Sequence, residues 1–165
     1  MILKIDTALD EETLQDLVQM YNTGDAETQY KIYLRTPGGL NGVTLAMIDL
    51  INNHAESTEL IAYHQICSNG MQLFFKAKCK KRIVPYTEGM SHLFKQTLDY
   101  YEGNVKNKNE YSSFINSNSN LEYSKSLHDV VGYTKDEWKR IKNNEDVWFT
   151  YERLQEMLTY NLTKL

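Results

Sequence analysis

The sequence predicts an α/β fold: a mainly parallel sheet with helices around it. Residues 30–35 alternate and are rich in aromatic and β-branched side chains, and residues 60–66 form an apolar run, as is typical of strands. Each segment is followed by a turn and then by apolar residues at helical spacing. Strand, turn and helix therefore occur twice in succession, which is the arrangement of parallel strands joined by helical crossovers.

Length and composition limit the possible functions. A chain of 165 residues is expected to form a single domain with a substantial core. Its formal charge of −4 argues against a nucleic-acid partner, and its apolar runs are too short to span a membrane. The two cysteines have neither metal-ligand spacing nor the context of a disulfide framework. We therefore expect a cytoplasmic protein without a metal or another cofactor.

The N-terminal half is predicted to alternate strands and helices. Residues 1–7 alternate weakly, as a short strand does, and Asp10 is a suitable N-cap for a helix that ends near Gly24. The strand at 30–35 enters the turn Thr36-Pro37-Gly38-Gly39, and a helix follows with its apolar face at Val43, Ala46, Met47 and Leu50.

The next strand, at 60–66, leads into a helix that begins at Ser68. This helix is predicted to continue into the basic run 76–82, which we interpret as a solvated helix C-terminus where cations suit the helix dipole. A short strand at 82–85 ends at Pro85, and residues 86–91 are predicted to form a loop.

The C-terminal part is predicted to be mostly helical. Residues 110–131 have an irregular helical pattern, which the poor helix formers at 116–120 interrupt. Thr134 is expected to cap a helix at 135–141, with Glu137 completing a capping box. Residues 151–160 predict a final amphipathic helix.

Ser68 is the first candidate for chemistry, because it lies where a buried strand turns into a helix. The amides of a helix N-terminus stabilise negative charge, so this serine is either a nucleophile or only an N-cap. The turn at Gly38 and Gly39 follows the other strand, so both turns are predicted to lie at the same sheet edge. The Gly39 N–H is either part of a tight turn or a donor to an oxyanion.

The segment from Lys31 to His92 resembles the proteolytic subunit family of the Clp protease, a self-compartmentalising serine peptidase. Residues 36–39 match its Ser-Pro-Gly-Gly turn, and residues 44–49 match its helix segment Gly-Leu-Ala-Ile-Tyr-Asp. Residues 64–70 match its nucleophile segment Gly-Gln-Ala-Ala-Ser-Met-Gly. In that family a Lys-Arg pair, a short strand and a proline precede the catalytic histidine, as Lys81-Arg82 and Pro85 precede His92 here.

The resemblance implies a ClpP/crotonase-like fold and acyl-transfer chemistry. Ser68 would be the nucleophile and His92 the general base, with the backbone N–H groups of Gly39 and Asn69 in the oxyanion hole. The other histidines, His54, His64 and His128, keep a structural interpretation.

The third member of the triad is not evident from this match. The family has an aspartate about fifty residues after the histidine, but counting forward from His92 or back from residues 148–150 reaches Ile141 or Lys142. Asn143 is our first choice, because an asparagine carbonyl can orient a histidine. The alternatives left open are Asn144, Glu145 and Asp146.

The resemblance also implies an organisation and partners. Residues 1–92 and 134–165 would form the head, and about 93–133 the helical handle that joins subunits into rings, which can stack. The expected substrate is a peptide or an unfolded protein, in the cytoplasm of a bacterium or of a virus-infected cell. No counterpart of the family's axial loops is evident, which argues against coupling to an unfoldase ATPase. The alternative function is a catalytically weak or inactive oligomeric scaffold, and the acyl-CoA chemistry of crotonases is more remote.

Overall fold

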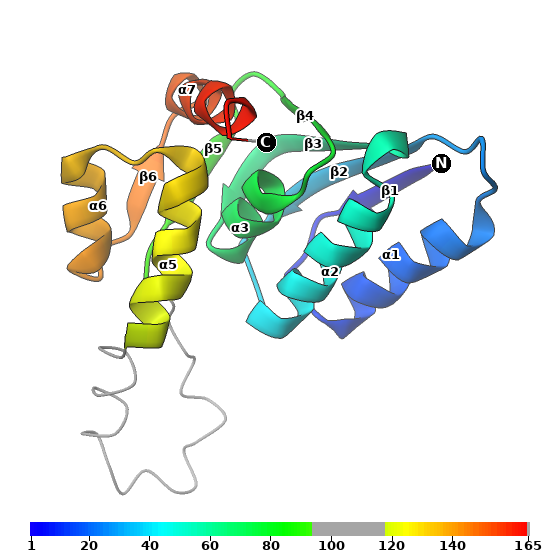
Figure 1. Ribbon diagram of the computed structural model, residues 1–165, viewed down its shortest axis with the longest axis horizontal. Coiled ribbons are helices and arrows are strands. Elements are labelled where there is room, and N and C mark those ends of the chain that lie inside the picture. Colours follow the sequence, from blue (N-terminus) through cyan, green and yellow to red (C-terminus); the bar gives the residue numbers. More distant parts are fainter. Residues whose placement is uncertain (94–117, 165) are drawn as a thin grey trace, which may run out of the picture.

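The computed structural model describes residues 1–93 and 118–164 and contains a six-stranded sheet in the order β1-β2-β3-β5-β6, with β4 also paired to β3 (Figure 1). All neighbouring strands are parallel except β5 and β6, which are antiparallel. The strands are β1 (Ile2–Ile5), β2 (Tyr30–Thr36), β3 (Thr58–Cys67), β4 (Lys80–Ile83), β5 (Glu88–Ser91) and β6 (Val147–Phe149).

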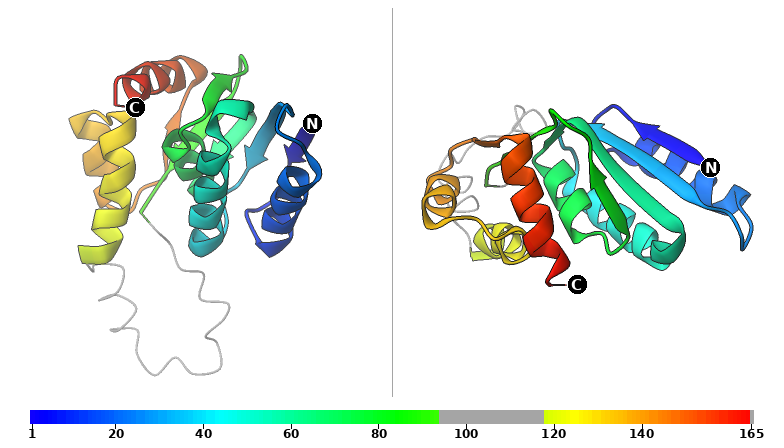
Figure 2. Two further views of the ribbon diagram at one scale, coloured as in Figure 1. Left: turned by 45° about the vertical axis from the view of Figure 1, so that its right-hand side comes forward. Right: turned by 90° about the horizontal axis from the view of Figure 1, so that it is seen from above.

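Helices α1, α2 and α3 lie on one face of this sheet, and α5 and α6 lie at its β6 end (Figure 2). The helices are α1 (Glu11–Thr23), α2 (Asn41–Asn53), α3 (Asn69–Lys76), α5 (Asn118–Val131), α6 (Lys135–Lys142) and α7 (Tyr151–Leu162), with a short 3₁₀ turn η1 (Ala55–Ser57). This arrangement confirms the predicted mixed α/β fold with a mostly parallel sheet.

Side-chain alternation explains why β2 lies where it does. Tyr30, Ile32, Leu34 and Thr36 are buried, whereas Lys31 and Arg35 between them are exposed. A strand with this period places one face on the helices and the other away from them. The predicted cap of α1 is also present, because the Thr13 N–H donates to the Asp10 carboxylate over 3.0 Å.

One edge of β3 is shared by two later strands. Residues Glu59–Ala62 pair with β4, and residues Gln65–Cys67 pair with β5. Between these halves His64 has a positive φ of 60°, and the register with β2 shifts there. The prediction of a loop at 86–91 is therefore wrong for residues 88–91, because the second half of β3 offers a free edge that β5 completes.

The basic run at 76–82 also differs from the prediction. Helix α3 ends at Lys76, and residues from Lys80 onward form β4. The Lys81 ammonium is largely buried and donates to the Phe75 carbonyl over 3.0 Å and to Asn161 Oδ1 over 2.7 Å. Lys81 therefore lies near the C-terminus of α3, as expected of a cation in this run. It is buried and belongs to β4, however, and is not part of a solvated helix end.

The C-terminal helices agree with the prediction in most respects. Thr134 and Glu137 form the expected capping box of α6. The interruption predicted at 116–120 is wrong for residues 118–120, which form the first turn of α5. The remainder of the predicted interface helix, residues 94–117, lies outside the described residues.

Candidate active site

Ser68 occupies a sharp turn between β3 and α3. Its φ of 53° and ψ of −118° are unusual for a residue with a side chain, and its hydroxyl makes no cap hydrogen bond although it holds the N-cap position. A serine in such a strand-to-helix turn projects its hydroxyl away from the backbone, as in a nucleophile elbow. Backbone strain of this kind persists only where neighbours enforce it. Here the Ser68 N–H donates to the Met90 carbonyl over 2.7 Å.

The glycine turn after β2 packs directly against this serine turn. The Asn69 side-chain amide donates to the Gly39 carbonyl over 2.6 Å. Gly38 has a φ of 107°, and a Cβ atom on it would lie 2.8 Å from Ser68 Cβ. Only glycine fits this backbone at this distance. The predicted meeting of the two turns at one sheet edge is therefore confirmed.

The Gly38–Gly39 peptide is fixed by the segment before α1. The Gly38 carbonyl accepts from the Leu9 N–H over 2.8 Å, and the Leu9 carbonyl accepts from the Leu40 N–H over 2.8 Å. Because N–H and C=O point in opposite directions across a trans peptide, the Gly39 N–H is directed away from Leu9.

Ser68 and His92 line one small cavity of about 20 Å³. Helices α3, α5 and α6 contribute to its walls, together with the end of β5. Its polar lining comprises Ser68, Asn69, Gln72, Ser91, His92 and Tyr133, among others. The structure thus brings three of the predicted site residues together: the serine, the histidine and Asn69.

His92 follows the last residue of β5, so the strand sets its position. Its Nδ1 contacts the backbone carbonyl oxygen of Leu93. A carbonyl oxygen only accepts hydrogen bonds, so a neutral ring that keeps this contact donates from Nδ1 and has its lone pair on Nε2. This is the tautomer that a general base needs when Nε2 faces the nucleophile.

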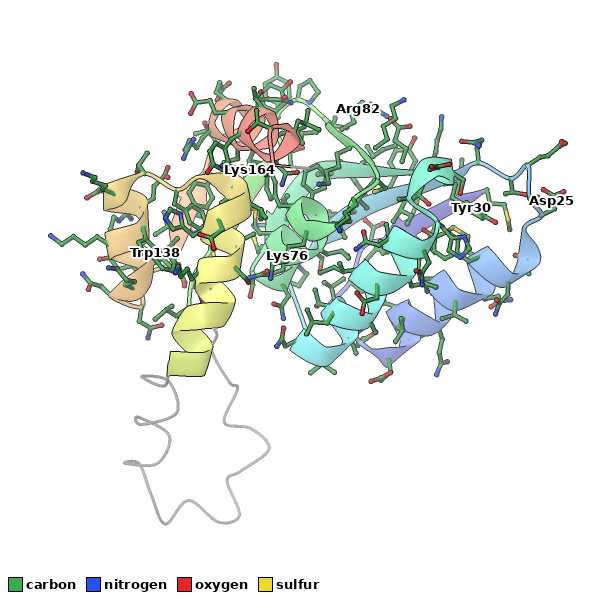
Figure 3. The ribbon with its side chains drawn as sticks, viewed as in Figure 1. Asp25, Tyr30, Lys76, Arg82, Trp138 and Lys164 are labelled. Atoms are coloured by element: carbon green, nitrogen blue, oxygen red, sulfur yellow. The ribbon has the colours of Figure 1, made fainter. Side chains whose placement is uncertain are left out.

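An aromatic layer holds the far wall of the cavity. The Tyr133 hydroxyl donates to Ser91 Oγ over 2.7 Å, and burial raises the pKa of Tyr133 far enough to keep it protonated. The Tyr133 ring is stacked 5.7 Å from Phe149. His128 is stacked 4.9 Å from Trp138, which Figure 3 labels on α6. This layer connects α5, α6 and β6 to the residue that precedes His92.

The predicted third-member candidates lie around the end of α6. Asn143 is the exposed C-cap residue, Asn144 has a left-handed φ of 64° typical of a helix stop, and Glu145 pairs with Arg140 at 3.0 Å. Asp146 directly precedes β6. The antiparallel pairing ends where Ser91 faces Val147, and the same register continued by one residue would bring His92 opposite Asp146. Directly opposed residues have Cβ atoms about 5 Å apart, within reach of a hydrogen bond.

The thiol of Cys67, next to Ser68, is held in its neutral form. Burial is the main factor that raises the pKa of this thiol to about 11, and the negative charges of Glu88 and Asp146 add to the effect. Strand β6 has the alternation of a half-buried strand, because Val147 and Phe149 are buried and Trp148 between them is exposed.

Within residues 1–93 and 118–164, no cluster of three or more histidine, cysteine or acidic side chains could hold a metal ion. In the same ranges, no helix has the length and apolar character needed to cross a membrane.

Comparison with solved structures identifies a similar fold. A mutant of ClpP1 from Listeria monocytogenes matches 94% of this chain and 86% of that chain, with a TM-score of 0.66 and 14% sequence identity. This likeness shows a ClpP-like fold, in agreement with the predicted fold class. No family model matches the sequence. A search of curated proteins found no match either.

Proposed function

We propose that this protein is a serine endopeptidase of the Clp proteolytic-subunit type, acting by acyl transfer. The observation that carries the proposal is the strained turn that projects the Ser68 hydroxyl into the cavity also lined by His92. Three further features support it: the meeting of two turns at the carboxyl ends of strands, a serine hydroxyl that makes no cap bond, and a histidine whose Nδ1 contacts a backbone carbonyl.

In the proposed mechanism Ser68 Oγ attacks a peptide carbonyl while His92 Nε2 takes its proton. The developing oxyanion is stabilised by the backbone N–H groups of Gly39 and Asn69, the second of which belongs to the first turn of α3. Each such donor contributes about 3–4 kcal/mol to transition-state stabilisation in comparable enzymes. His92 then passes the proton to the leaving amine, and water hydrolyses the acyl-enzyme.

We assign the orienting role to Asp146 in place of our first choice, Asn143. The pairing of β5 with β6, continued one residue beyond Ser91 and Val147, supports this assignment. In the working triad the Nδ1–H of His92 would donate to Asp146 instead of to the Leu93 carbonyl. A carboxylate also stabilises the imidazolium that forms in the transition state better than an amide does. Asn143 and Asn144 are accounted for by the turn that ends α6.

A fluorophosphonate probe tests the proposal directly, because it reacts only with an activated serine. We expect labelling of the wild-type protein at one peptide, the one containing Ser68, and none in Ser68→Ala. Ser57→Ala is the matched control, since Ser57 bonds only to the His54 backbone and lies at the opposite end of β3. A folded wild-type protein that remains unlabelled would rule out the peptidase.

An inactive oligomeric scaffold is the second candidate. One observation favours it: a cavity of about 20 Å³ holds a water molecule but not a peptide. Under the peptidase proposal, the peptide binds outside this cavity, on the surface where Gly39 is exposed. The labelling experiment separates the two candidates, because a scaffold with a closed site does not react.

A further inference from the structure

Gln72 is buried beside the proposed nucleophile without a role in the mechanism above. It lies on α3 one turn after Ser68, and its N–H donates to the Ser68 carbonyl over 3.4 Å. Its side chain is only 4% exposed and lines the same cavity as Ser68 and His92. Its Oε1 atom is completely buried and has no hydrogen-bond partner within residues 1–93 and 118–164.

A buried amide oxygen requires a donor, and the cavity has room for only a small one. Its volume of about 20 Å³ corresponds to one water molecule, and a buried water needs two to four polar partners. Besides Gln72 and Ser68, two other serines, Ser91 and Ser124, line the same cavity. Ser91 Oγ already accepts the Tyr133 hydroxyl, so its own proton is available for another acceptor.

From this arrangement we infer that Gln72 positions a single water molecule in the cavity, and that this water hydrolyses the acyl-Ser68 intermediate. The inference rests on the proposed function. Gln72 Oε1 accepts one hydrogen of the water, which orients the oxygen toward the ester carbonyl. Gln72 is a positioning residue, since it contacts the water and not the acyl group.

Hydrolysis of the acyl-enzyme needs only this water and His92. The water oxygen forms a bond to the ester carbonyl carbon while His92 Nε2 takes one water proton. The tetrahedral intermediate then breaks its bond to Ser68 Oγ, which receives that proton from His92. The product is a carboxylic acid and the free enzyme, and no other reactant is needed.

Kinetics on Gln72→Met separate this role from a structural one, because methionine has a similar length but no acceptor. With p-nitrophenyl acetate, we expect the acylation burst to change little and hydrolysis of the acetyl-enzyme to slow about tenfold or more. Gln72→Glu restores an acceptor and should recover most of the hydrolysis rate. Gln19→Met, on the exposed side of α1, is the matched control and should behave as wild type. Two results for Gln72→Met would overturn the inference: rates of acylation and hydrolysis that fall by the same factor, or a hydrolysis rate within about twofold of the wild-type rate.

A crystal structure of Ser68→Ala tests the water site without any activity. We expect density for one water within hydrogen-bond distance of Gln72 Oε1, and its loss in the double variant that also carries Gln72→Met. A dry cavity overturns the inference even if the enzyme is active. A different result is a water bound at Gln72 together with a wild-type protein that fluorophosphonate does not label. That result would refute the peptidase proposal, and with it the role of this water in hydrolysis.

Discussion

Gly38 is the residue on whose backbone the site most depends. Its φ of 107° lies in a region that side chains avoid, and its Cα faces Ser68. Ser68 also has a positive φ, of 53°, although it carries a side chain. The backbone of the serine is therefore strained, whereas the glycine that packs against it adopts its positive φ without strain.

Replacing Gly38 by alanine should damage both stability and chemistry. We expect Gly38→Ala to lower the free energy of unfolding by more than about 1 kcal/mol, because the new Cβ is strained and meets Ser68 Cβ. Fluorophosphonate labelling should fall with it. Gly42→Ala is the matched control: it lies in α2 with nothing within 4 Å of its added Cβ, so it should stabilise by about 0.5 kcal/mol. Urea denaturation of the two variants makes the comparison, and equal effects would contradict it.

The assignment of Asp146 leads to a second prediction at the residue scale. Asp146→Asn should lower kcat on a fluorogenic peptide by about 10⁴-fold, since the histidine loses its orienting carboxylate. Asn143→Ala should leave kcat within about twofold, because Asn143 is exposed at the end of α6. The reverse result, with Asn143 required and Asp146 dispensable, would return the role to Asn143.

The positions of Ser68 and Gly39 at one sheet edge could be predicted from the sequence, because each residue lies in the turn that follows a strong strand pattern. His92 needed the resemblance, since nothing in its local composition distinguishes it from His54 or His64. Counting residues left Asp146 as one of three alternatives to Asn143, because the length of chain between His92 and β6 is not fixed by any period. The pairing of β5 with β6 is the reason that we now prefer Asp146.

At the element scale, two of the three misassigned segments, those that contain β4 and β5, have one cause. Strands β4 and β5 are four residues each and carry few apolar side chains, so their propensity is weak. They form because β3 is ten residues long and offers both of them a backbone edge. Tertiary pairing thus overrides local preference, which is the usual limit of strand prediction.

Burial of Lys81 in β4 should be visible in the pH dependence of stability. Desolvation lowers the pKa of Lys81 to about 8 from its ordinary value of 10.5, so above pH 8 the folded state binds fewer protons than the unfolded state. Between about pH 8 and 9 this contribution of Lys81 should raise the stability of the wild type relative to that of Lys81→Met. The buried cysteines, whose pKa values are raised, act in the opposite direction in both proteins. Urea denaturation of both proteins at about pH 7, 8 and 9 therefore measures the effect as the difference between the two pH profiles. Parallel pH profiles for both proteins would show that Lys81 keeps its ordinary pKa.

At the scale of the whole molecule, the parallel strand order follows directly from the repeated strand–turn–helix pattern. The sheet is covered on only one side by the described helices (Figure 2). On the other side Ile2, Tyr33, Tyr63 and Val84 line an open hollow of about 490 Å³. Parallel sheets are normally covered on both faces. This unpaired face supports the expectation of a homo-oligomer.

We therefore expect self-association, as a ring in which copies of the chain enclose the sites. Multi-angle light scattering at micromolar concentration should give a mass that is a multiple of 19.3 kDa. Ser68→Ala should assemble equally well, because the serine contributes to chemistry and not to an interface. A mass equal to one chain would exclude the ring and leave the peptidase proposal to be tested separately.

The antiparallel pair β5–β6 has a consequence for biosynthesis. Ser68 and His92 are made early, but Asp146 is translated roughly fifty residues after His92 and reaches the site only when β6 joins the sheet. At usual translation rates that delay is roughly 3–10 s. Under the proposed mechanism, the emerging polypeptide carries during this interval a nucleophile and a base without the carboxylate assigned to align them. The proposal therefore expects a ribosome-bound chain to be unable to cleave its neighbours until β6 has been synthesised.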